Sequence, residues 1–311
     1  MTEYVETALD AGEKVSVTDQ CAIVHLKVCQ WGGTKLDRKE SNDLLIRKAA
    51  GQGSAKVEKS LLGDDIKPIN TIVNTIRTTN KAHTLPYDDN ARRILPSSYI
   101  LEHKQIMEGL ARELSLAVAK LIKDWPLAMA RAQSRLAGLY DPTDYPDVSE
   151  IPAKFSMDVR YHPIPKGEHF AFDASDEIMR ELKAQCDARH EQQFKQAHKN
   201  LYEQLNELTK AFEEAMAKQP YEKVDKDGNV RVIKPKFQTT TLTKIEELAN
   251  RIPKLNLTGD KNIEELANSV KSTLLTHESS ELRNNPSLRE QKAIEARAQI
   301  DKIQDAMKGV Y

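Results

Sequence analysis

The feature that most limits the possible folds is an amphipathic helical pattern that runs from Ser97 to Gly138. Its apolar side chains recur every three or four residues, so they lie along one broad face of the helix. Ser97 or Ser98 should cap this helix, because a serine side chain can bond an amide of the first turn. Pro126 should end or kink it near Trp125, because proline lacks an amide hydrogen and clashes with the preceding turn. The rest of the chain should pack around this helix.

Composition agrees with a helix-rich protein that has a real core. Among 311 residues, 39% are hydrophobic, 30% charged and 5% aromatic, which is typical of long solvated helices. The net charge of −1 conceals an acidic start and a basic region. Residues 1–19 carry one Lys against five acids, and residues 20–135 carry 19 Lys and Arg against 12 acids. This excess of seven cations is a mild basic bias.

The location is predicted from what the sequence lacks. Three cysteines, Cys21, Cys29 and Cys186, have no metal-type spacing and form an odd number, as expected for reduced thiols. The first twenty residues have no apolar core and do not resemble a signal peptide. No apolar run approaches the roughly 18 residues of a membrane span. We therefore expect a cytoplasmic protein that does not bind membranes.

Two segments alternate between apolar and polar residues and predict strands, residues 22–31 and 154–162, which should pair with each other. Between them, helices are expected over residues 35–50, 55–62 and about 65–80, the last capped by Asp64 or Asp65. Residues 83–96 contain two prolines and a polar group, so they predict a loop or short strand. The residues from 20 to 172 should form an α+β core domain, after an acidic, mobile segment at 1–19.

The second half, residues 173–311, predicts a helical arm and C-terminal helices. Asp173 or Ser175 should cap a helix that runs to about Lys218 and carries one thin apolar stripe. This coiled-coil-like arm needs a packing partner, either a helix near the C-terminus or another subunit, and we favour an oligomer. A hairpin around Asp227-Gly228 and three further helices should follow, at residues 242–252, 261–277 and 286–308. Asn285 should cap the last helix, with Pro286 in its first turn.

The chain is therefore predicted to be mainly α with a small antiparallel β-sheet. None of its motifs is typical of an enzyme. Gly51–Ser54 lacks the spacing of a phosphate loop. Asp225, Asp227 and Asn229 imitate the start of a calcium loop, but Val230 stands in place of the turning glycine and the last position has no glutamate. His162 and His169 are isolated candidates for metal ligands. We expect no catalytic residue, no metal and no cofactor.

Basic and aromatic residues in the first half are the best candidates for a binding site. Strands and loops that combine an aromatic ring with Lys or Arg can hold single-stranded DNA by base stacking and phosphate neutralisation. The alternative is that these cations form a solvated helix face and that the tryptophan belongs to the core. The candidate nucleic-acid-binding residues are Lys27, Trp31, Lys35, Arg38, Lys39, Arg92 and Arg93.

Four motifs resemble an uncharacterised family of phage and bacterial proteins that is known only as a domain of unknown function. They are HTLPYDDNARRILP (83–96), GLYDPTDYP (138–146), KFSMDVRYHPIP (154–165) and RIPKLNLTGD (251–260). Members are encoded near MoxR-type AAA+ ATPases and von Willebrand factor A proteins. The resemblance covers about residues 20–275 and implies a phage origin and a role in phage DNA metabolism or in ATPase-driven assembly.

Two functions are therefore predicted. The first is a non-enzymatic phage protein in the bacterial cytoplasm that binds nucleic acid, in particular single-stranded DNA, as an oligomer. The second is an adaptor or scaffold for a MoxR-type ATPase, with a self-assembling helical structural protein as a related possibility.

Overall fold

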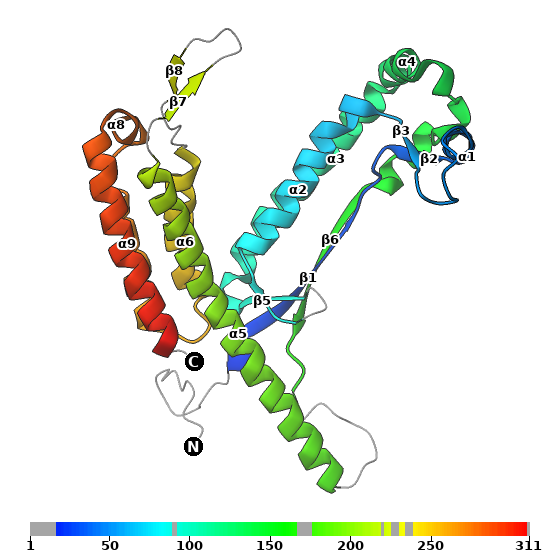
Figure 1. Ribbon diagram of the computed structural model, residues 1–311. Coiled ribbons are helices and arrows are strands. Elements are labelled where there is room, and N and C mark those ends of the chain that lie inside the picture. The colour runs from blue at the N-terminus through cyan, green and yellow to red at the C-terminus, as the bar shows by residue number, and fades with distance from the viewer. Residues whose placement is uncertain are drawn as a thin grey trace. The chain divides into compact units, whose positions relative to one another are not determined.

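The computed structural model describes residues 17–88, 92–166, 176–218, 221–224, 230–233 and 239–309. The protein is mainly α-helical with a small antiparallel sheet, as predicted (Figure 1). The chain folds into two compact units, each built from segments that are distant in sequence. We call residues 25–82 and 101–160 the α2–α3 unit, and residues 1–24, 83–100 and 161–311 the α5–α9 unit.

The amphipathic segment after Pro96 forms helix as predicted, but in several pieces. The 3₁₀ turn η3 (Ser97–Tyr99) leads into α3 (Ile100–Lys123), and α4 (Trp125–Leu136) leads into η4 (Ala137–Leu139). The break at Asp124 directly precedes Trp125 and Pro126, where it was expected. The predicted serine cap is wrong. Pro96 precedes η3 without a side-chain cap, and Ser97 instead donates through its hydroxyl and its amide to the Gln20 carbonyl, at 2.9 and 2.6 Å.

The core of the α2–α3 unit lies between its two long helices. The turn η2 (Gly63–Ile66) precedes α2 (Lys67–Ala82), which runs beside α3 (Figure 1). Ile69, Val73 and Ile76 of α2 belong to one buried cluster with Met107, Leu114, Val118 and Leu121 of α3. Burying each such side chain contributes about 1.5–3 kcal/mol, so this face holds the unit together.

The two predicted strands are neighbours in a four-stranded sheet, which confirms their pairing. The sheet has the order β4-β5-β1-β6. β1 pairs antiparallel with β5, from Cys21 opposite Pro96 to Val24 opposite Arg93. Residues 83–96 thus supply two strands of their own. The strands are β1 (Cys21–Cys29), β4 (Leu85–Pro86), β5 (Arg93–Pro96) and β6 (Ser156–Pro163).

Two predicted helices are wrong in part or in full. The segment expected as helix 35–50 begins as strand β2 (Thr34–Asp37) and becomes α1 (Arg38–Arg47) only after Asp37 caps it. The segment expected as helix 55–62 contains β3 (Val57–Ser60), which pairs antiparallel with β2. The reason is tertiary, because Lys59 in β3 is buried between two carboxylates, and such contacts override weak local helix propensity.

Helices dominate the α5–α9 unit, and α5 is its long arm (Figure 1). The predicted apolar stripe of α5 is buried at Ala197, Leu201, Leu205, Phe212 and Met216. α5 packs against α9 and α6, so its stripe has a partner inside the chain. The helices are α5 (Asp176–Ala217), α6 (Thr239–Leu255), α7 (Lys261–Leu274), α8 (Ser279–Asn284) and α9 (Pro286–Gly309).

The ends of these elements agree with the sequence where they are described. Asn285 caps α9, because its side-chain oxygen accepts a hydrogen bond of 3.1 Å from the Leu288 amide. The predicted hairpin is present as β7 (Tyr221–Val224) and β8 (Val230–Ile233). Its turn at 225–229 and the predicted caps Asp173 and Ser175 lie outside the described residues.

Candidate nucleic-acid interface

Two of the predicted binding residues stand at the N-terminal end of α1. Arg38 and Lys39 occupy its first turn, and both are exposed. Neither has a carboxylate partner among the described residues. A helix N-terminus carries a partial positive charge, so two cations there are electrostatically unfavourable for the helix and attractive to anions.

A buried ion network fixes the start of α1. Asp37 caps the helix by accepting a hydrogen bond of 3.0 Å from the Glu40 amide. Its second oxygen lies 3.1 Å from the Lys59 ammonium, which also pairs with Asp144. The hydrogen bond from the Glu40 amide and the contact with Lys59 lower the pKa of Asp37. The hydrogen bonds to the Asp144 and Asp37 carboxylates raise the pKa of Lys59. The Asp37 charge is therefore neutralised inside the fold, and Arg38 and Lys39 face solvent beside it.

Lys35 and Trp31, two further predicted residues, take part in the fold. The Lys35 ammonium lies 2.6 Å from Asp144, in the GLYDPTDYP motif. The Trp31 ring packs on the core tryptophan Trp125, with 6.4 Å between ring centroids. Trp31 is half-buried, so it is a residue of the core and does not form an open platform for base stacking. Lys27, on β1, is exposed.

Arg92 and Arg93 belong to the other unit, the α5–α9 unit, and each has a partner there. Arg92 pairs with Asp88 and lies over the Tyr87 ring, 5.7 Å from its centroid. Arg93 donates two hydrogen bonds of 2.6 Å to the hydroxyl and carbonyl oxygens of Thr84. Burial lowers the pKa of Arg93 to about 10. Reversing the charge of Arg93 would remove both bonds to Thr84, so this residue supports the fold.

A polar network that sequence reasoning missed joins α5 to the turn before α7. The Thr258 hydroxyl lies 2.7 Å from His198 Nδ1, and His198 Nε2 lies 3.0 Å from Asp260. Tyr202 donates a hydrogen bond of 2.6 Å to the same carboxylate oxygen. Two signals in the sequence could have revealed this network. His198 and Tyr202 are spaced to lie on one face of a helix, and Asp260 comes just before another helix.

This network resembles a hydroxyl–imidazole–carboxylate relay, but its contacts are those of a helix cap. The other Asp260 oxygen accepts from the Asn262 amide at 2.8 Å and so caps α7. Burial lowers the pKa of His198 against the opposing effect of Asp260, which disfavours a strong base. Burial and Asp260 also raise the pKa of Tyr202. The arrangement anchors the α6–α7 turn to α5.

A sulfur–imidazole contact lies on α5 itself. The Cys186 sulfur lies 3.8 Å from His190 Nε2 and 4.0 Å from Nδ1, one helical turn away. Both ring nitrogens are thus nearly equidistant, so the sulfur rests against the ring. Burial lowers the pKa of His190, which keeps the imidazole neutral and leaves it a poor partner for a thiolate.

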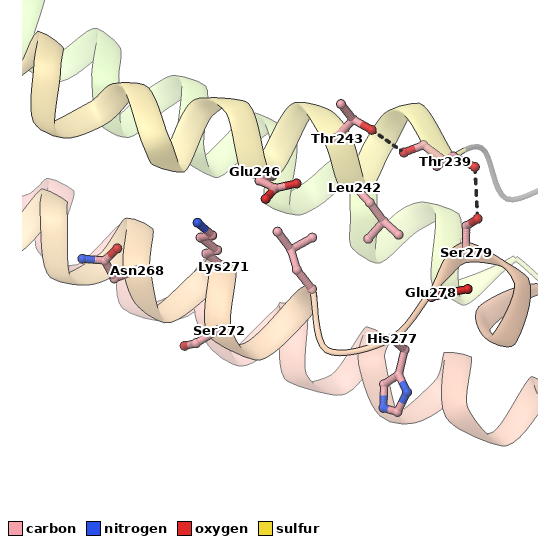
Figure 2. Close-up of a pocket in the computed structure, with 11 residues that line it drawn as sticks. Thr239, Leu242, Thr243, Glu246, Asn268, Lys271, Ser272, His277, Glu278 and Ser279 are labelled. Atoms are coloured by element: carbon pink, nitrogen blue, oxygen red, sulfur yellow. Dashed lines mark hydrogen bonds between the residues drawn. The ribbon is translucent and has the colours of Figure 1, made fainter.

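A hollow of about 770 Å³ lies between α6, α7 and the turn before α8 (Figure 2). Thr239 closes one end by donating a hydrogen bond of 3.0 Å to Ser279. The lining includes the carboxylates Glu246 and Glu278 and the Lys271 ammonium. Because both charge signs are present, the hollow does not select an anionic or a cationic ligand.

The described ranges hold no group of three or more His, Cys, Asp and Glu side chains arranged to bind a metal ion. Within the same ranges, no helix is both long enough and apolar enough to cross a bilayer. Comparison with known proteins finds no matching family model, no similar curated protein and no similar solved structure.

Proposed function

We propose that this chain is a non-enzymatic phage protein of the bacterial cytoplasm that binds nucleic acid, single-stranded DNA in particular, and acts as an oligomer. The observation that carries the proposal is the position of Arg38 and Lys39 in the first turn of α1. Their charges add to the positive end of the helix dipole, a cost to the helix that a bound phosphate would offset. Because Trp31 is packed in the core, binding rests on phosphates, and sequence preference should be weak.

The mode of binding should show in its salt dependence. A labelled oligothymidine should bind at low salt, and affinity should fall with a slope of roughly 0.7 per phosphate contact on logarithmic axes. Arg38→Glu with Lys39→Glu removes two contacts and should lower that slope by about 1.4. Fluorescence anisotropy at several salt concentrations measures both quantities.

The control reverses two exposed lysines of the other unit, Lys244→Glu with Lys261→Glu. This variant makes the same change in net charge as the reversal at Arg38 and Lys39. Because its lysines lie outside the proposed interface on α1, it should leave the slope and the affinity nearly unchanged. Equal loss in both double variants would mean that only net charge matters. Undiminished binding after reversal at Arg38 and Lys39 would remove α1 from the interface.

The adaptor function stands as a second proposal, in which a MoxR-type ATPase is the partner. The first turns of α5, from Asp176 to Gln185, are exposed except for the half-buried Met179 and Leu182. Such a long, solvated helix end suits presentation to another protein. Absence of oligothymidine binding at low salt would favour this second function over the first.

A further inference from the structure

The hollow between α6 and α7 is lined by two opposite charges that are not paired with each other. Glu246 of α6 is exposed and makes no hydrogen bond or ion pair within the described part of the chain. Lys271 of α7 is half-buried and donates a hydrogen bond of 2.8 Å to the Asn250 side-chain oxygen. An ammonium group has three N–H donors, so Lys271 can still bind a ligand. Figure 2 shows the Glu246 and Lys271 side chains pointing toward one another from the two helices.

An apolar part of the hollow adjoins these charges. Leu242 precedes Glu246 by one turn of α6, and Leu275 follows Lys271 by one turn at the end of α7. A short connection joins α6 to α7, so the two helices run antiparallel. Both leucines therefore lie toward the end of the hollow that Thr239 and Ser279 close, and both are half-buried. The hollow thus has a charged part and an apolar part side by side.

This lining favours a ligand that carries both charge signs. An anion would bind Lys271 but meet the free carboxylate of Glu246, and a cation would meet the opposite conflict. A zwitterion satisfies both groups at once, because each of its charges faces one of opposite sign. Glu278, the second carboxylate of the lining, already accepts a hydrogen bond of 3.4 Å from the Ser280 hydroxyl. The volume of about 770 Å³ lies within the range of small-molecule sites.

We propose that this hollow binds a free α-amino acid with an aliphatic side chain. The ligand's ammonium group binds Glu246, its carboxylate binds Lys271, and its side chain covers Leu242 and Leu275. The site lies in the α5–α9 unit, and the α1 interface lies in the other unit, so amino-acid binding does not depend on nucleic-acid binding. The amino-acid titration and the DNA titration can therefore fail independently.

Isothermal titration calorimetry of the full chain with L-leucine tests the proposal. Three analogues each lack one group of leucine: isocaproic acid lacks the ammonium group, isoamylamine lacks the carboxylate, and glycine lacks the side chain. Leucine should bind at least about tenfold more tightly than each analogue, because each loses a charge-assisted hydrogen bond or a buried aliphatic group. Leucine that binds no more tightly than its analogues, or that does not bind at millimolar concentration, would overturn the proposal.

Two single variants assign the charged contacts. Glu246→Gln removes the partner of the ammonium group, so leucine should lose its advantage over isocaproic acid and keep its advantage over isoamylamine. Lys271→Gln removes the partner of the carboxylate and should have the reverse effect. A purely structural role of these side chains would weaken leucine and both analogues alike, and that result would contradict the proposed contacts.

The matched controls are Glu247→Gln and Lys244→Gln, which neutralise exposed residues of α6 outside the lining. Glu247 lies 3.5 Å from Arg251, on the same helix. Both controls should keep the advantage of leucine over each analogue. Far-ultraviolet circular dichroism checks that every variant remains folded. An equal loss of leucine binding in the controls would show that net charge, and not the hollow, determines the binding, and would overturn the proposal.

Discussion

At the scale of single residues, His198 is a buried imidazole with a polar partner at each ring nitrogen. It is 6% exposed, with Thr258 at one ring nitrogen and Asp260 at the other. A neutral ring can accept from the Thr258 hydroxyl and donate to Asp260 at once. A protonated ring cannot accept, so the network is built for the neutral form.

This environment predicts a pH dependence. Burial lowers the pKa of His198 below its ordinary value of 6.5, so the unfolded chain binds the proton first as pH falls. The stabilising contribution is therefore complete above about pH 6.5 and is lost as pH drops below that value. His198→Gln keeps an amide in the site but does not titrate. The unchanged chain should be more stable than this variant at pH 7.5, and the difference in unfolding free energy should shrink as pH is lowered to 5.

Urea unfolding at several pH values measures that difference. His25→Gln, which makes the same substitution at an exposed position of β1, is the matched control. A difference for His198→Gln that stays constant over this range would contradict a neutral, buried imidazole.

At the scale of elements, the paired strands β2 and β3 depend on one buried lysine. The Lys59 side chain is 7% exposed and pairs with Asp37 and Asp144, which are 15% and 6% exposed. Asp144 and Tyr145 come from the GLYDPTDYP motif, and the Tyr145 hydroxyl donates to the Leu61 carbonyl at 3.1 Å. Within the α2–α3 unit this motif therefore ties the β2–β3 pair to the segment after α4.

Lys59→Met should destabilise the protein by roughly 2–3 kcal/mol, because it leaves two carboxylates without their buried cation. Lys35→Met removes a cation that pairs with the same Asp144 but is 48% exposed, so it should cost less than about 1 kcal/mol. Guanidinium unfolding compares the two. The pKa values of Asp37 and Asp144 are lowered, so the Lys59 effect should fade as pH drops below about 4. Equal costs for both variants would contradict the network.

At the scale of the whole molecule, the question is what covers the stripe of α5. Within the α5–α9 unit, α9 lies along it, and Arg297 pairs with Glu213 at 2.7 Å between the two helices. The α5 stripe therefore has a partner inside the chain and does not itself require a second subunit.

Two isoleucines of α9 test this packing. Ile303 is fully buried and Ile294 is 67% exposed. Ile303→Asp should place a charge in the core and destabilise the protein by more than about 3 kcal/mol, with aggregation on heating. Ile294→Asp should change stability by less than about 0.5 kcal/mol. Thermal unfolding with light scattering compares them, and similar melting temperatures would mean that α9 does not cover α5.

The sequence by itself determined the elements whose patterns are local. The α3 face, the α5 stripe, the β7–β8 hairpin and the Asn285 cap all follow from spacing or from a short side-chain bond, because such signals depend on neighbours in the chain. The fold class followed from their number and length. Arg38 and Lys39 were found as candidate binding residues in the same way, from charge alone.

Only the tertiary structure decided where polar residues are buried. In α9 the covered face includes the polar residues Arg289, Lys292 and Gln299, and Ile294 is exposed. Lys292 can be buried because the Thr273 carbonyl accepts its hydrogen bond at 2.6 Å, and Lys59 is buried in β3 because two carboxylates surround it. A buried charge needs partners distant in sequence, and no local pattern reveals them.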